Sequence, residues 1–597
     1  MLDSSDTPAF LNVSQSLLGR RWVARDPAAE RMGAAIAQQH RLPEIVGAIL
    51  AARGVAIEEA AAYLNPTLRD LLPDPLSLKD MDRAADRLAH AITHRERIAV
   101  FGDYDVDGAA SAALLVRWLG QLGLKVTLYI PDRIDEGYGL NIPAMEELAA
   151  AHDLLIAVDC GTLSFEPIAA ARAKGAEVIV ADHHLAGETV PDCAAVVNPN
   201  RQDDESGQGH LCAAGVVFLM LVATQNVLKQ QSYFGQSKPP NLLGLLDIVA
   251  LATVADVAPL IGVNRALVRQ GLKVMAQREN IGLRALADVG RLTSMPAAYH
   301  LGYVLGPRIN AGGRVGEADL GARLLTTESM EEAQALAERL DAYNDQRRSV
   351  EAAVLEAAEM QIEDRPGGAD GALVWAAGDG WHPGVVGIVA SRLKEKYNRP
   401  ALVIGFDEEG VGKGSGRSIE GVDLGRSIAT CTREALLLKG GGHKMAAGVT
   451  VEKDRLPDAL ARLTELLDAQ GAAAMGPRDL RIDGAVSPKG ASLDLLEQVE
   501  AAGPFGPANP APRFAIPSAR ISWAKPAGES HLRFTATDGM GGKLEAIAFR
   551  AFDGPLGDFL ANRASRPVHL AGRLEIDDWG GRRRPKLRVE DAADITG

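Results

Sequence analysis

Short apolar runs that alternate with helical patterns constrain this chain most strongly. From residue 98, the segments IAVFGD, VTLYIPD, LLIAVDCG and EVIVADHH are separated by Ala/Leu-rich stretches with helical spacing, which begin near residues 109, 143 and 165. Apolar runs of four to six residues with helices between them are typical of a parallel sheet that is covered on both faces. We therefore predict an α/β domain, with a mostly helical segment at 212–275 packed against its sheet.

Later changes of pattern divide the rest of the chain. A long, charged, proline-free stretch at 329–363 predicts a helix that bridges two domains, and a second α/β pattern follows it. From about residue 480, five short strand-like segments with turn residues between them suit a small β-barrel of OB type. The predicted fold class is multidomain α/β, with these parts: a helical N-terminal extension (1–80), a parallel-sheet domain (81–328), a connecting helix (329–364), a smaller α/β domain (365–470) and a C-terminal OB-like barrel (471–597).

The charge of the chain limits how it could hold nucleic acid. The 597 residues include 63 Lys and Arg against 78 Asp and Glu, and 63 − 78 gives a formal net charge of −15. Non-specific binding of nucleic acid needs concentrated Lys and Arg, so a protein this acidic cannot coat it by bulk attraction. Any such partner must be held by a local basic groove or by bound metal ions.

The cysteines and the termini suggest where the protein works. Its four cysteines show no CxxC spacing, which disfavours a disulfide scaffold or a zinc ribbon and fits a reducing compartment. The N-terminus has neither a basic nor an apolar signal region. The most apolar long stretch, 241–263, contains Asp247 and Asp256, so a buried core helix followed by a loop is a better interpretation than a membrane span. We expect a cytoplasmic protein with no membrane partner.

Acidic residues and histidines follow the strands of the first predicted sheet. They are Asp103, Asp105 and Asp107 in FGDYDVDG, Asp159 in AVDCG, Asp182, His183 and His184 in VADHH, and Asp256 at the end of the apolar run ATVADVAPL. Ligands of open parallel sheets bind beyond the carboxyl ends of the strands, and carboxylates gathered there repel one another unless cations neutralise them. Oxygen ligands with one or two imidazoles and no thiolate favour Mn²⁺ or Mg²⁺. Two such ions ~3.5–4 Å apart are a standard device for cleaving phosphodiesters.

The spacing of these acidic residues supports a shared metal site, although each residue taken alone has another interpretation. In extended backbone Asp105 and Asp107 would point to one side, towards the same pair of ions, and Gly108 would permit a tight turn before the next helix. A single Asp after a strand is usually a cap or turn residue, and Asp-His-His alone could be an ordinary loop. Asp103 and Asp182 could instead hydrogen-bond to the backbone or to a ligand histidine.

Further motifs predict contacts with phosphate or with a nucleic-acid strand. GPRINAGGR places Arg308 and Arg314 around Asn310 in a predicted Gly-rich loop, which suits either a phosphate clamp or a structural Arg that bridges two domains. GSGRS, with Ser415 and Arg417, is predicted to be a Gly/Ser-rich turn whose N–H groups approach an anion.

Two other motifs belong to this predicted set. Three glycines before His443 in GGGHKMAAG imply a close backbone approach, although a tight strand connection is the alternative. The run GGRRRPKLRV, with Arg582, Arg583 and Arg584, fits a single-strand groove beside Trp579, Phe534 and Phe549, and its alternative is a solvated loop. The chain has no GxxxxGK[ST] motif, so we expect no nucleotide cofactor.

These motifs together resemble a known family. DYDVDG, VDCG, ADHH and Asp256 resemble the four motifs of the DHH phosphoesterase superfamily, and WHPGVVGIVASRL, GPRINAGGRVG, SGRS and GGGHKMAAG resemble those of the bacterial RecJ single-strand-specific exonucleases over roughly residues 20–597. The resemblance implies DHH, DHHA1 and OB-fold domains. It also implies Asp105, Asp107, Asp159, His183 and Asp256 as ligands of two Mn²⁺ or Mg²⁺ ions. His184 would lie against the scissile phosphate, with Asp103 and Asp182 in support. One departure is Gly312, where the family motif has Ala.

The activity that these motifs and the resemblance imply is that of a metal-dependent single-stranded-DNA exonuclease. Arg308 or Arg314 would stabilise the transition state together with His184. The resemblance, rather than any residue pattern, implies 5′→3′ release of 5′-mononucleotides, roles in recombination and repair, and a single-strand-binding protein and a helicase as partners. Two alternatives stay open: a phosphodiesterase of short oligonucleotides or cyclic dinucleotides, and a non-catalytic DHH replication scaffold.

Overall fold

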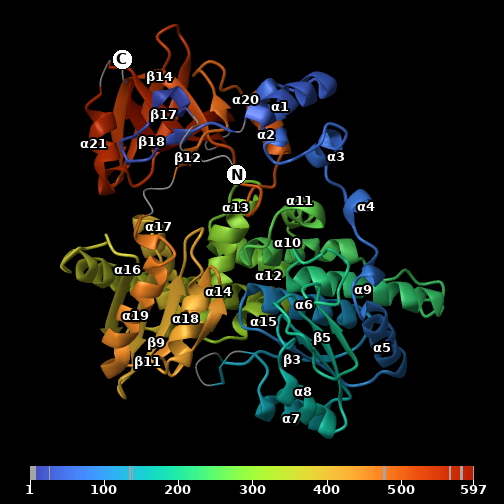
Figure 1. The fold of residues 1–597 in the computed structure, drawn as a ribbon. Helices are drawn as coiled ribbons and strands as arrows, with labels where there is room; N and C mark the ends of the chain where they lie inside the picture. Colours follow the sequence, from blue (N-terminus) through green and yellow to red (C-terminus); the bar gives the residue numbers. More distant parts are fainter. Residues whose placement is uncertain are drawn as a thin grey trace. The chain divides into compact units, whose positions relative to one another are not determined.

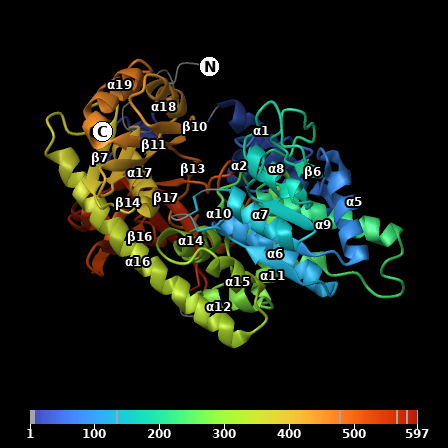
Figure 2. The ribbon, with the colours of Figure 1, turned by 90° about the horizontal axis from the view of Figure 1, so that it is seen from below.

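The structure is a computed structural model (Figures 1 and 2), and it describes residues 8–25, 27–132, 136–137, 139–474, 479–563, 566–578 and 582–595. The chain forms two compact units. One unit combines Met1–Asp341 with Leu480–Gly597, and the other is Ala342–Asp479. The long helix α16 (Met330–Glu363), which is conspicuous in Figure 2, begins in the first unit and ends in the second.

A five-stranded parallel sheet forms the centre of the α/β part of the first unit. Its strands, in sheet order, are β3 (Val126–Tyr129), β2 (Ile98–Gly102), β4 (Leu154–Val158), β5 (Glu177–Ala181) and β6 (Ala195–Val197). The helices that cover it are α5 (Met81–His94), α6 (Val106–Gln121), α7 (Ile142–Ala151), α8 (Phe165–Ala173) and α9 (Ala213–Gln230). Helices α7 and α8 share one apolar cluster with one face of the sheet, whereas α5, α6 and α9 contact strands of the same sheet and, through α9, one another (Figure 1). Every residue of β2 and β4 is buried, which explains their uninterrupted apolar sequence.

A helical region continues the first unit. Its elements are η3 (Leu242–Leu245), α10 (Leu246–Ala255), α11 (Gly262–Ala276), α12 (Ile281–Val289), α13 (Ala298–His300), the π-helical turn η4 (Leu301–Leu305), α14 (Gly306–Val315) and α15 (Leu320–Thr326). The predicted core helix at 241–263 is η3 and α10, and the predicted loop follows it until the next helix begins at Gly262. Among the described helices, α9 is long and apolar enough to cross a membrane, although 72% of it is buried inside the fold.

The GPRINAGGR motif corrects one prediction. We predicted a Gly-rich loop, but the segment is the helix α14. Pro307 is compatible with the first helical turn, where its missing N–H costs nothing. The glycines serve close packing: a Cβ at Gly313 would lie 2.8 Å from the Tyr104 ring, and one at Gly312 would lie 2.8 Å from the Glu317 carbonyl oxygen.

The second unit is built on a mixed five-stranded sheet. Its strands, in sheet order, are β10 (Lys439–His443), β11 (Ala446–Glu452), β9 (Val411–Arg417), β8 (Ala401–Phe406) and β7 (Val374–Asp379). Strands β7 and β8 are parallel, and the other neighbours are antiparallel. The helical elements are α17 (Pro383–Tyr397), α18 (Leu424–Arg433), η5 (Lys453–Arg455), α19 (Leu456–Asp468) and η6 (Ala472–Ala474).

The predicted turn at GSGRS is wrong, because the first four of these residues belong to β9 and Ser418 follows the strand. Glycines alternate along this strand at 412, 414 and 416. A Cβ at Gly412 or Gly414 would lie 2.7 Å from the Ile404 side chain, and one at Gly416 would lie 2.7 Å from Leu424. The glycines therefore mark the packed face of a strand rather than a turn.

The C-terminal part of the first unit is a β-barrel. Its elements are β12 (Leu480–Arg481), β13 (Gly484–Ala485), α20 (Leu493–Ala501), β14 (Phe514–Ala527), β15 (His531–Thr537), β16 (Lys543–Ala548), η7 (Ala551–Asp553), α21 (Pro555–Ala561), β17 (Val568–Asp577) and β18 (Arg584–Asp594). The order β14-β15-β16-β18-β17 closes through an additional pairing of β14 with β17. The closed barrel leaves these five strands without an open edge between first and last.

The N-terminal segment packs on this barrel. Its elements are η1 (Phe10–Asn12), β1 (Trp22–Val23), α1 (Pro27–His40), α2 (Glu44–Ala51), α3 (Ala60–Leu64), α4 (Leu68–Leu71) and η2 (Pro75–Ser77). Strand β1 pairs with β12, and Ile49 and Leu50 of α2 share an apolar core with Phe514 and Phe534. The buried Trp22 indole donates to the Asp591 carboxylate at 3.2 Å. Much of the N-terminal segment is thus packed against the barrel.

Candidate metal centre

The predicted acidic residues and histidines meet at the carboxyl ends of neighbouring strands. Asp103 and Asp105 follow β2, Asp159 follows β4, and the Asp182–His184 turn follows β5. Asp256 reaches the same place from the end of α10. Three groups of ligand atoms each lie within 4.8 Å of one another: Asp103, Asp105 and Asp159; Asp107, His183 and Asp256; and Asp159, His183 and His184. Asp159 and His183 each belong to two groups and so connect the set.

Helix geometry rather than extended backbone places Asp105 and Asp107. The helix α6 begins at Val106, so the prediction that both residues lie in extended backbone is wrong for Asp107. The Asp105 carboxylate caps the helix by accepting from the N–H groups of Asp107 (2.9 Å) and Gly108 (3.2 Å). Gly108 is inside this helix rather than in a turn, and its missing side chain lets the helix approach the backbone of Asp103 closely.

The buried carboxylate of Asp107 is held by the first turn of another helix. It accepts hydrogen bonds from the backbone N–H of Ala213 (2.7 Å) and Ala214 (2.8 Å) at the start of α9. These N–H groups and the helix dipole favour negative charge there. Burial nevertheless raises the pKa of Asp107 above its usual value, against the opposing charge of His183.

His183 stands among three carboxylates. Its Nε2 atom lies 3.3 Å from Asp159 Oδ1, 3.7 Å from Asp107 Oδ2 and 3.8 Å from Asp256 Oδ2. The buried atoms Asp159 Oδ1 and His183 Nε2 have no hydrogen-bond partner among the described residues. Buried polar atoms are normally satisfied, so two that face each other in this way fit a bound cation.

The electrostatics of the site point the same way. Burial, reinforced by the neighbouring carboxylates, raises the pKa of Asp159 far above its usual value and that of Asp256 to about 9. The site thus gathers more carboxyl groups than can all be ionised unless positive charge is bound among them. The donors are carboxylate oxygens and imidazole nitrogens, which suit Mn²⁺ or Mg²⁺.

Asp182 orients the histidines rather than joining the ligand groups found among the described residues. Its carboxylate accepts from the N–H of His183 (2.7 Å), from His184 Nδ1 (2.8 Å), and from the N–H and hydroxyl of Thr162. Burial would raise the pKa of Asp182, but the bonds and charge of His184 lower it well below its usual range. Burial lowers the pKa of His184, and the bond and charge of Asp182 overcome this and raise it to about 9.

Comparison with known proteins places this arrangement in a family. Family models match residues 97–253 (DHH family, N-terminal domain), 370–469 (DHHA1 domain) and 482–591 (RecJ OB domain). The chain is 35% identical over 570 residues to the single-stranded-DNA-specific exonuclease RecJ of Salmonella typhimurium, and the match covers 92% of this chain and 96% of that protein. It is 34% identical over 566 residues to RecJ of Escherichia coli, with the same coverage.

The chain belongs to the RecJ family. Solved structures agree with this: RecJ from Thermus thermophilus in complex with Mn²⁺ has a TM-score of 0.77 and 31% identity, covering 96% of this chain and 79% of that chain. The complex of the same protein with Mg²⁺ has a TM-score of 0.72. The expected α/β fold with DHH, DHHA1 and OB domains is thereby confirmed.

Sequence reasoning missed the residues that hold the histidine turn. The Asn198 side chain, which follows β6, donates to Thr162 Oγ1 and to the His184 carbonyl oxygen, both at 2.8 Å. Asn200 donates to the His183 carbonyl oxygen at 2.6 Å. The sequence signal that could have found them is the pair of asparagines in VVNPN, which follows β6 at the same edge of the sheet.

The GPRINAGGR residues make structural contacts. Arg308 Nε lies 2.8 Å from Asp341 of α16, and its Nη1 donates to the Val304 carbonyl oxygen. The Asn310 side chain accepts from the Val106 N–H at 3.1 Å and so anchors the start of α6 beside the metal centre. These contacts favour the structural alternative for Arg308. Arg314 is half-buried on the same helix, in its last turn.

The predicted phosphate contacts of the second unit lie on β9 and β10. Arg417 Nη1 donates to Ser415 Oγ at 2.8 Å, and both side chains lie against Gly387 of α17, where an added Cβ would be 3.1 Å from Ser415 Oγ. His443 ends β10 and pairs with Ala446, so Lys444 and Met445 form a two-residue hairpin turn. The structure thus bears out the tight strand connection at this motif.

The barrel holds the basic run beside acidic partners. Arg583 lies 2.7 Å from Glu497, Arg584 lies 2.6 Å from Glu545, and all four side chains are substantially exposed. Arg582 is exposed in the segment before β18. Phe534 is buried in the barrel core, so it cannot be a stacking platform, whereas Phe549 is exposed with Arg588 5.3 Å over its ring. Trp579, Gly580 and Gly581 lie outside the described residues.

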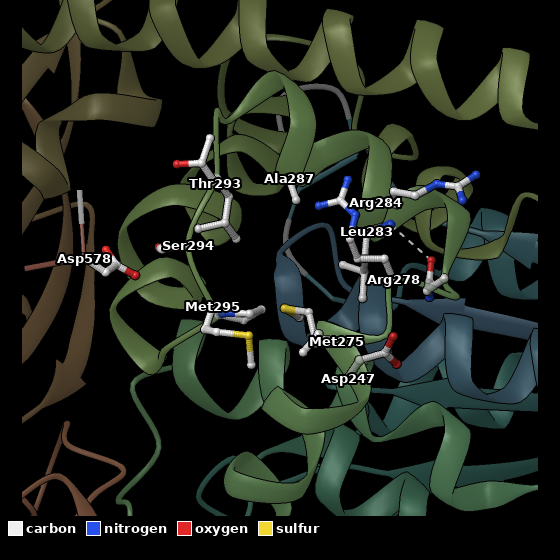
Figure 3. Close-up of a pocket in the computed structure, with 14 residues that line it drawn as sticks. Asp247, Met275, Arg278, Leu283, Arg284, Ala287, Thr293, Ser294, Met295 and Asp578 are labelled. Atoms are coloured by element: carbon white, nitrogen blue, oxygen red, sulfur yellow. Dashed lines mark hydrogen bonds between the residues drawn. The ribbon is translucent and has the colours of Figure 1, made fainter. Parts of the chain in front are cut away.

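A separate cavity of about 370 Å³ lies in the helical region (Figure 3). Its lining includes Asp247, Met275, Arg278, Arg284 and Met295, and none of the predicted metal ligands among the described residues. Figure 3 shows the two methionine side chains directed towards each other across the cavity. It is therefore distinct from the metal centre.

Proposed function

We propose that this chain is a metal-dependent exonuclease that hydrolyses terminal phosphodiesters of single-stranded DNA in the 5′→3′ direction and releases 5′-mononucleotides. The observation that carries the proposal is the buried pair Asp159 Oδ1 and His183 Nε2, which have no hydrogen-bond partner among the described residues and lie within a ring of carboxylates. The RecJ relatives are named single-stranded-DNA-specific exonucleases, and structures of one contain Mn²⁺ or Mg²⁺.

The residues divide into holders of metal and supporters of the reacting phosphate. Asp105, Asp107, Asp159, His183 and Asp256 would hold the two ions. When bound, Mn²⁺ or Mg²⁺ neutralises charge on the phosphodiester and makes water more acidic. Among the protein's own groups, Asp182 fixes His184 through Nδ1, so we assign the other ring nitrogen, Nε2, a hydrogen bond to the scissile phosphate. Asp103 would support the site from the group that it forms with Asp105 and Asp159.

The remaining parts of the proposal concern the grip on the strand and the cellular setting. We assign contacts with phosphate or with the strand to Arg314, Ser415, Arg417 and His443. In the barrel, we assign contacts with the strand to Arg582, Arg583 and Arg584. Arg308 and Asn310 primarily make the structural bonds described above, and any direct contact with DNA is secondary to these. A cytoplasmic location fits the four free, buried cysteines. Roles in recombination and repair, with a single-strand-binding protein and a helicase as partners, complete the proposal.

Substitutions at the two ends of one strand test the metal centre. Asp159 follows β4, whereas Asp153 precedes it and forms a surface ion pair with Arg97. Asp159→Asn, Asp105→Ala and His183→Ala should each lower cleavage of a 5′-labelled single strand by at least ~1000-fold, because they remove ligands. Asp153→Asn should keep nearly wild-type rates. Mn²⁺ should raise the melting temperature of the wild type but not that of Asp159→Asn.

The same assay distinguishes the alternative functions. A phosphodiesterase of short oligonucleotides would cleave a dinucleotide much faster than a long strand, and a scaffold would cleave neither. A 5′ single-stranded tail should be degraded and a blunt duplex should resist. Faster cleavage from 3′ ends, or activity that persists in EDTA, would reject the proposed reaction.

A further inference from the structure

Two exposed tyrosines lie stacked on the helical segment before α14. Tyr299 of α13 and Tyr303 of η4 are one turn apart, with ring centroids 5.0 Å apart and an interplanar angle of 23°. Their exposed fractions are 54% and 68%. A single exposed aromatic residue is ordinary on a protein surface, but two stacked rings form an ordered aromatic surface open to solvent.

The turn that carries these tyrosines packs on the end of α10 that presents Asp256. A Cβ at Gly302 would lie 3.4 Å from Val254 Cγ1, and one at Gly306 would lie 3.1 Å from Ala255 Cβ. The backbone at Gly302 of η4 and at Gly306, the first residue of α14, therefore comes close to the last two residues of α10, and Asp256 follows directly. A π-helical turn such as η4 is uncommon and is frequent at functional sites.

Val257, the residue after Asp256, adds an exposed apolar side chain. It has a φ of +61°, in the left-handed region, and its exposed fraction is 66%. A β-branched residue in this conformation costs on the order of 1–2 kcal/mol and persists only where its surroundings require it. The fold thus keeps a strained, solvent-exposed valine immediately beside a predicted metal ligand.

We propose that Val257, Tyr299 and Tyr303 form a base-stacking strip that seats nucleobases of the single strand next to the bond that is cleaved. The inference rests on the proposed function, because it needs a strand whose phosphate lies at the metal centre. The bases of such a strand would lie beside its phosphates, and thus near the end of α10 that presents Asp256. Aromatic faces bind unpaired bases without regard to sequence. They also need no positive charge, which suits a chain with a net charge of −15.

A comparison of strands with and without bases tests the strip. The substrates are a 5′-labelled single strand and the same strand with abasic sites at its first four nucleotides. The wild type should cleave the abasic strand with kcat/KM about 10- to 100-fold lower, the factor expected when one or two stacked bases are removed. The double variant Tyr299→Ala/Tyr303→Ala should lose a similar factor on the normal strand, mainly through KM, and should no longer distinguish the two strands.

Matched variants separate stacking from folding. Tyr299→Phe/Tyr303→Phe keeps both rings and should restore discrimination to near the wild-type value. Tyr233→Ala removes another exposed tyrosine, 36% exposed beyond the end of α9, and should change neither rate. Each variant should show the same Mn²⁺-induced rise in melting temperature as the wild type, since no metal ligand is altered.

Binding measured without cleavage separates this inference from the proposed function. In Ca²⁺ instead of Mn²⁺, 2-aminopurine near the 5′ end should be quenched by the wild type and by the Phe variant but not by the Ala variant. Discrimination retained by the Ala variant would overturn the strip while leaving the exonuclease activity intact. Loss of binding to single-strand-binding protein with unchanged DNA discrimination would also overturn it, since the tyrosines would then dock a protein. A wild type that cleaves no strand would instead reject the proposed function.

Discussion

Gly108 shows how one missing side chain shapes the metal centre. A Cβ at this position would lie 2.6 Å from the Asp103 nitrogen and 2.7 Å from its carbonyl carbon, and closer still to the carbonyl oxygen. These are backbone atoms that cannot swing away. We expect Gly108→Ala to destabilise the first unit by ~1–3 kcal/mol, as overpacking does, and to abolish activity by displacing Asp103, Asp105 and Asp107.

The same helix offers the control for this prediction. Gly120 also lies in α6, but a Cβ there would meet nothing within 4 Å. Gly120→Ala should therefore stabilise the protein by up to ~1 kcal/mol through helix propensity and leave cleavage unchanged. Denaturant unfolding and the rate on a labelled single strand measure both variants. Equal behaviour of the two would contradict the steric explanation.

Asp247 predicts a pH dependence of stability away from the metal centre. This carboxyl is 3% exposed in the lining of the cavity in Figure 3, and burial raises its pKa to about 6. The folded protein keeps this proton at pH values where the unfolded chain has lost it. The free energy of unfolding should therefore fall by ~3 kcal/mol as pH rises from about 4 to about 6.

The variant Asp247→Asn isolates this contribution. The amide resembles the protonated acid in shape and cannot ionise, so its unfolding free energy should lack this part of the pH slope. Urea titrations of both proteins at about pH 4 and about pH 7 measure the difference, because all other titrating groups are common to them. Parallel pH profiles would show that Asp247 ionises without cost in the folded state.

The sequence predicted those residues of the candidate site that directly follow a buried strand. A polar residue after a buried apolar run is visible in sequence, and the carboxyl ends of β2, β4 and β5 bring Asp103, Asp159 and His183 together. The hydrogen bond from the Val106 N–H to the Asn310 side chain was not predictable, because it joins residues 204 positions apart through helix packing. Asn198 was missed for a related reason, since its role depends on a carbonyl oxygen of another loop.

At the scale of elements, glycine was the residue that misled the sequence analysis. Glycines in α14 and β9 predicted a loop and a turn, since glycine is common in both. In the structure they allow close packing of a regular helix and a regular strand. Uninterrupted apolar runs, by contrast, indicated the central strands correctly, because every residue of β2 and β4 is buried. The long, charged, proline-free stretch likewise indicated α16 correctly.

Two neighbouring glycines in the hairpin formed by β10 and β11 allow a test of whether glycine serves packing or recognition. A Cβ at Gly440 would lie 2.6 Å from Thr432 Oγ1 and 2.8 Å from Ile428 Cγ2 of α18, whereas one at Gly441 would meet nothing within 4 Å. Gly440→Ala should destabilise the second unit by ~1–3 kcal/mol. Gly441→Ala should leave stability unchanged but weaken single-strand binding several-fold if this hairpin approaches the strand closely. Affinity and unfolding measured on both variants separate packing from recognition.

At the scale of the whole molecule, the two ends of the chain build one body. Strand β1 pairs with β12, and the Trp22 indole donates to Asp591, 569 residues away. Sequence patterns describe neighbours along the chain, so they marked residues 1–80 only as a helical N-terminal extension. Only the long-range pairing reveals that the barrel core includes residues of α1 and α2.

The barrel's basic run supplies the last prediction, which concerns how catalysis and grip are divided. The candidate metal ligands lie between residues 103 and 256, whereas Arg582, Arg583, Arg584 and Lys586 lie in or beside β18. Neutralising these four residues to Gln should weaken binding of a long single strand. It should also make the salt dependence shallower, by at most ~0.7 in log–log slope for each phosphate that these side chains neutralise. At saturating substrate, turnover should stay near the wild-type value, and very short oligonucleotides should be cleaved almost equally by both proteins.

Substituting the acidic partners of this run should have the opposite effect on affinity for a long single strand. Glu497 and Glu545 pair with Arg583 and Arg584 at the surface, where ion pairs contribute little to stability and so exchange readily for phosphate. Glu497→Gln/Glu545→Gln should therefore tighten long-strand binding and steepen its salt dependence without affecting the fold. If both the Gln-for-Arg/Lys and the Gln-for-Glu variants bind long strands as the wild type does, the run is a solvated loop. The acidic chain must then hold its strand through residues other than this basic run.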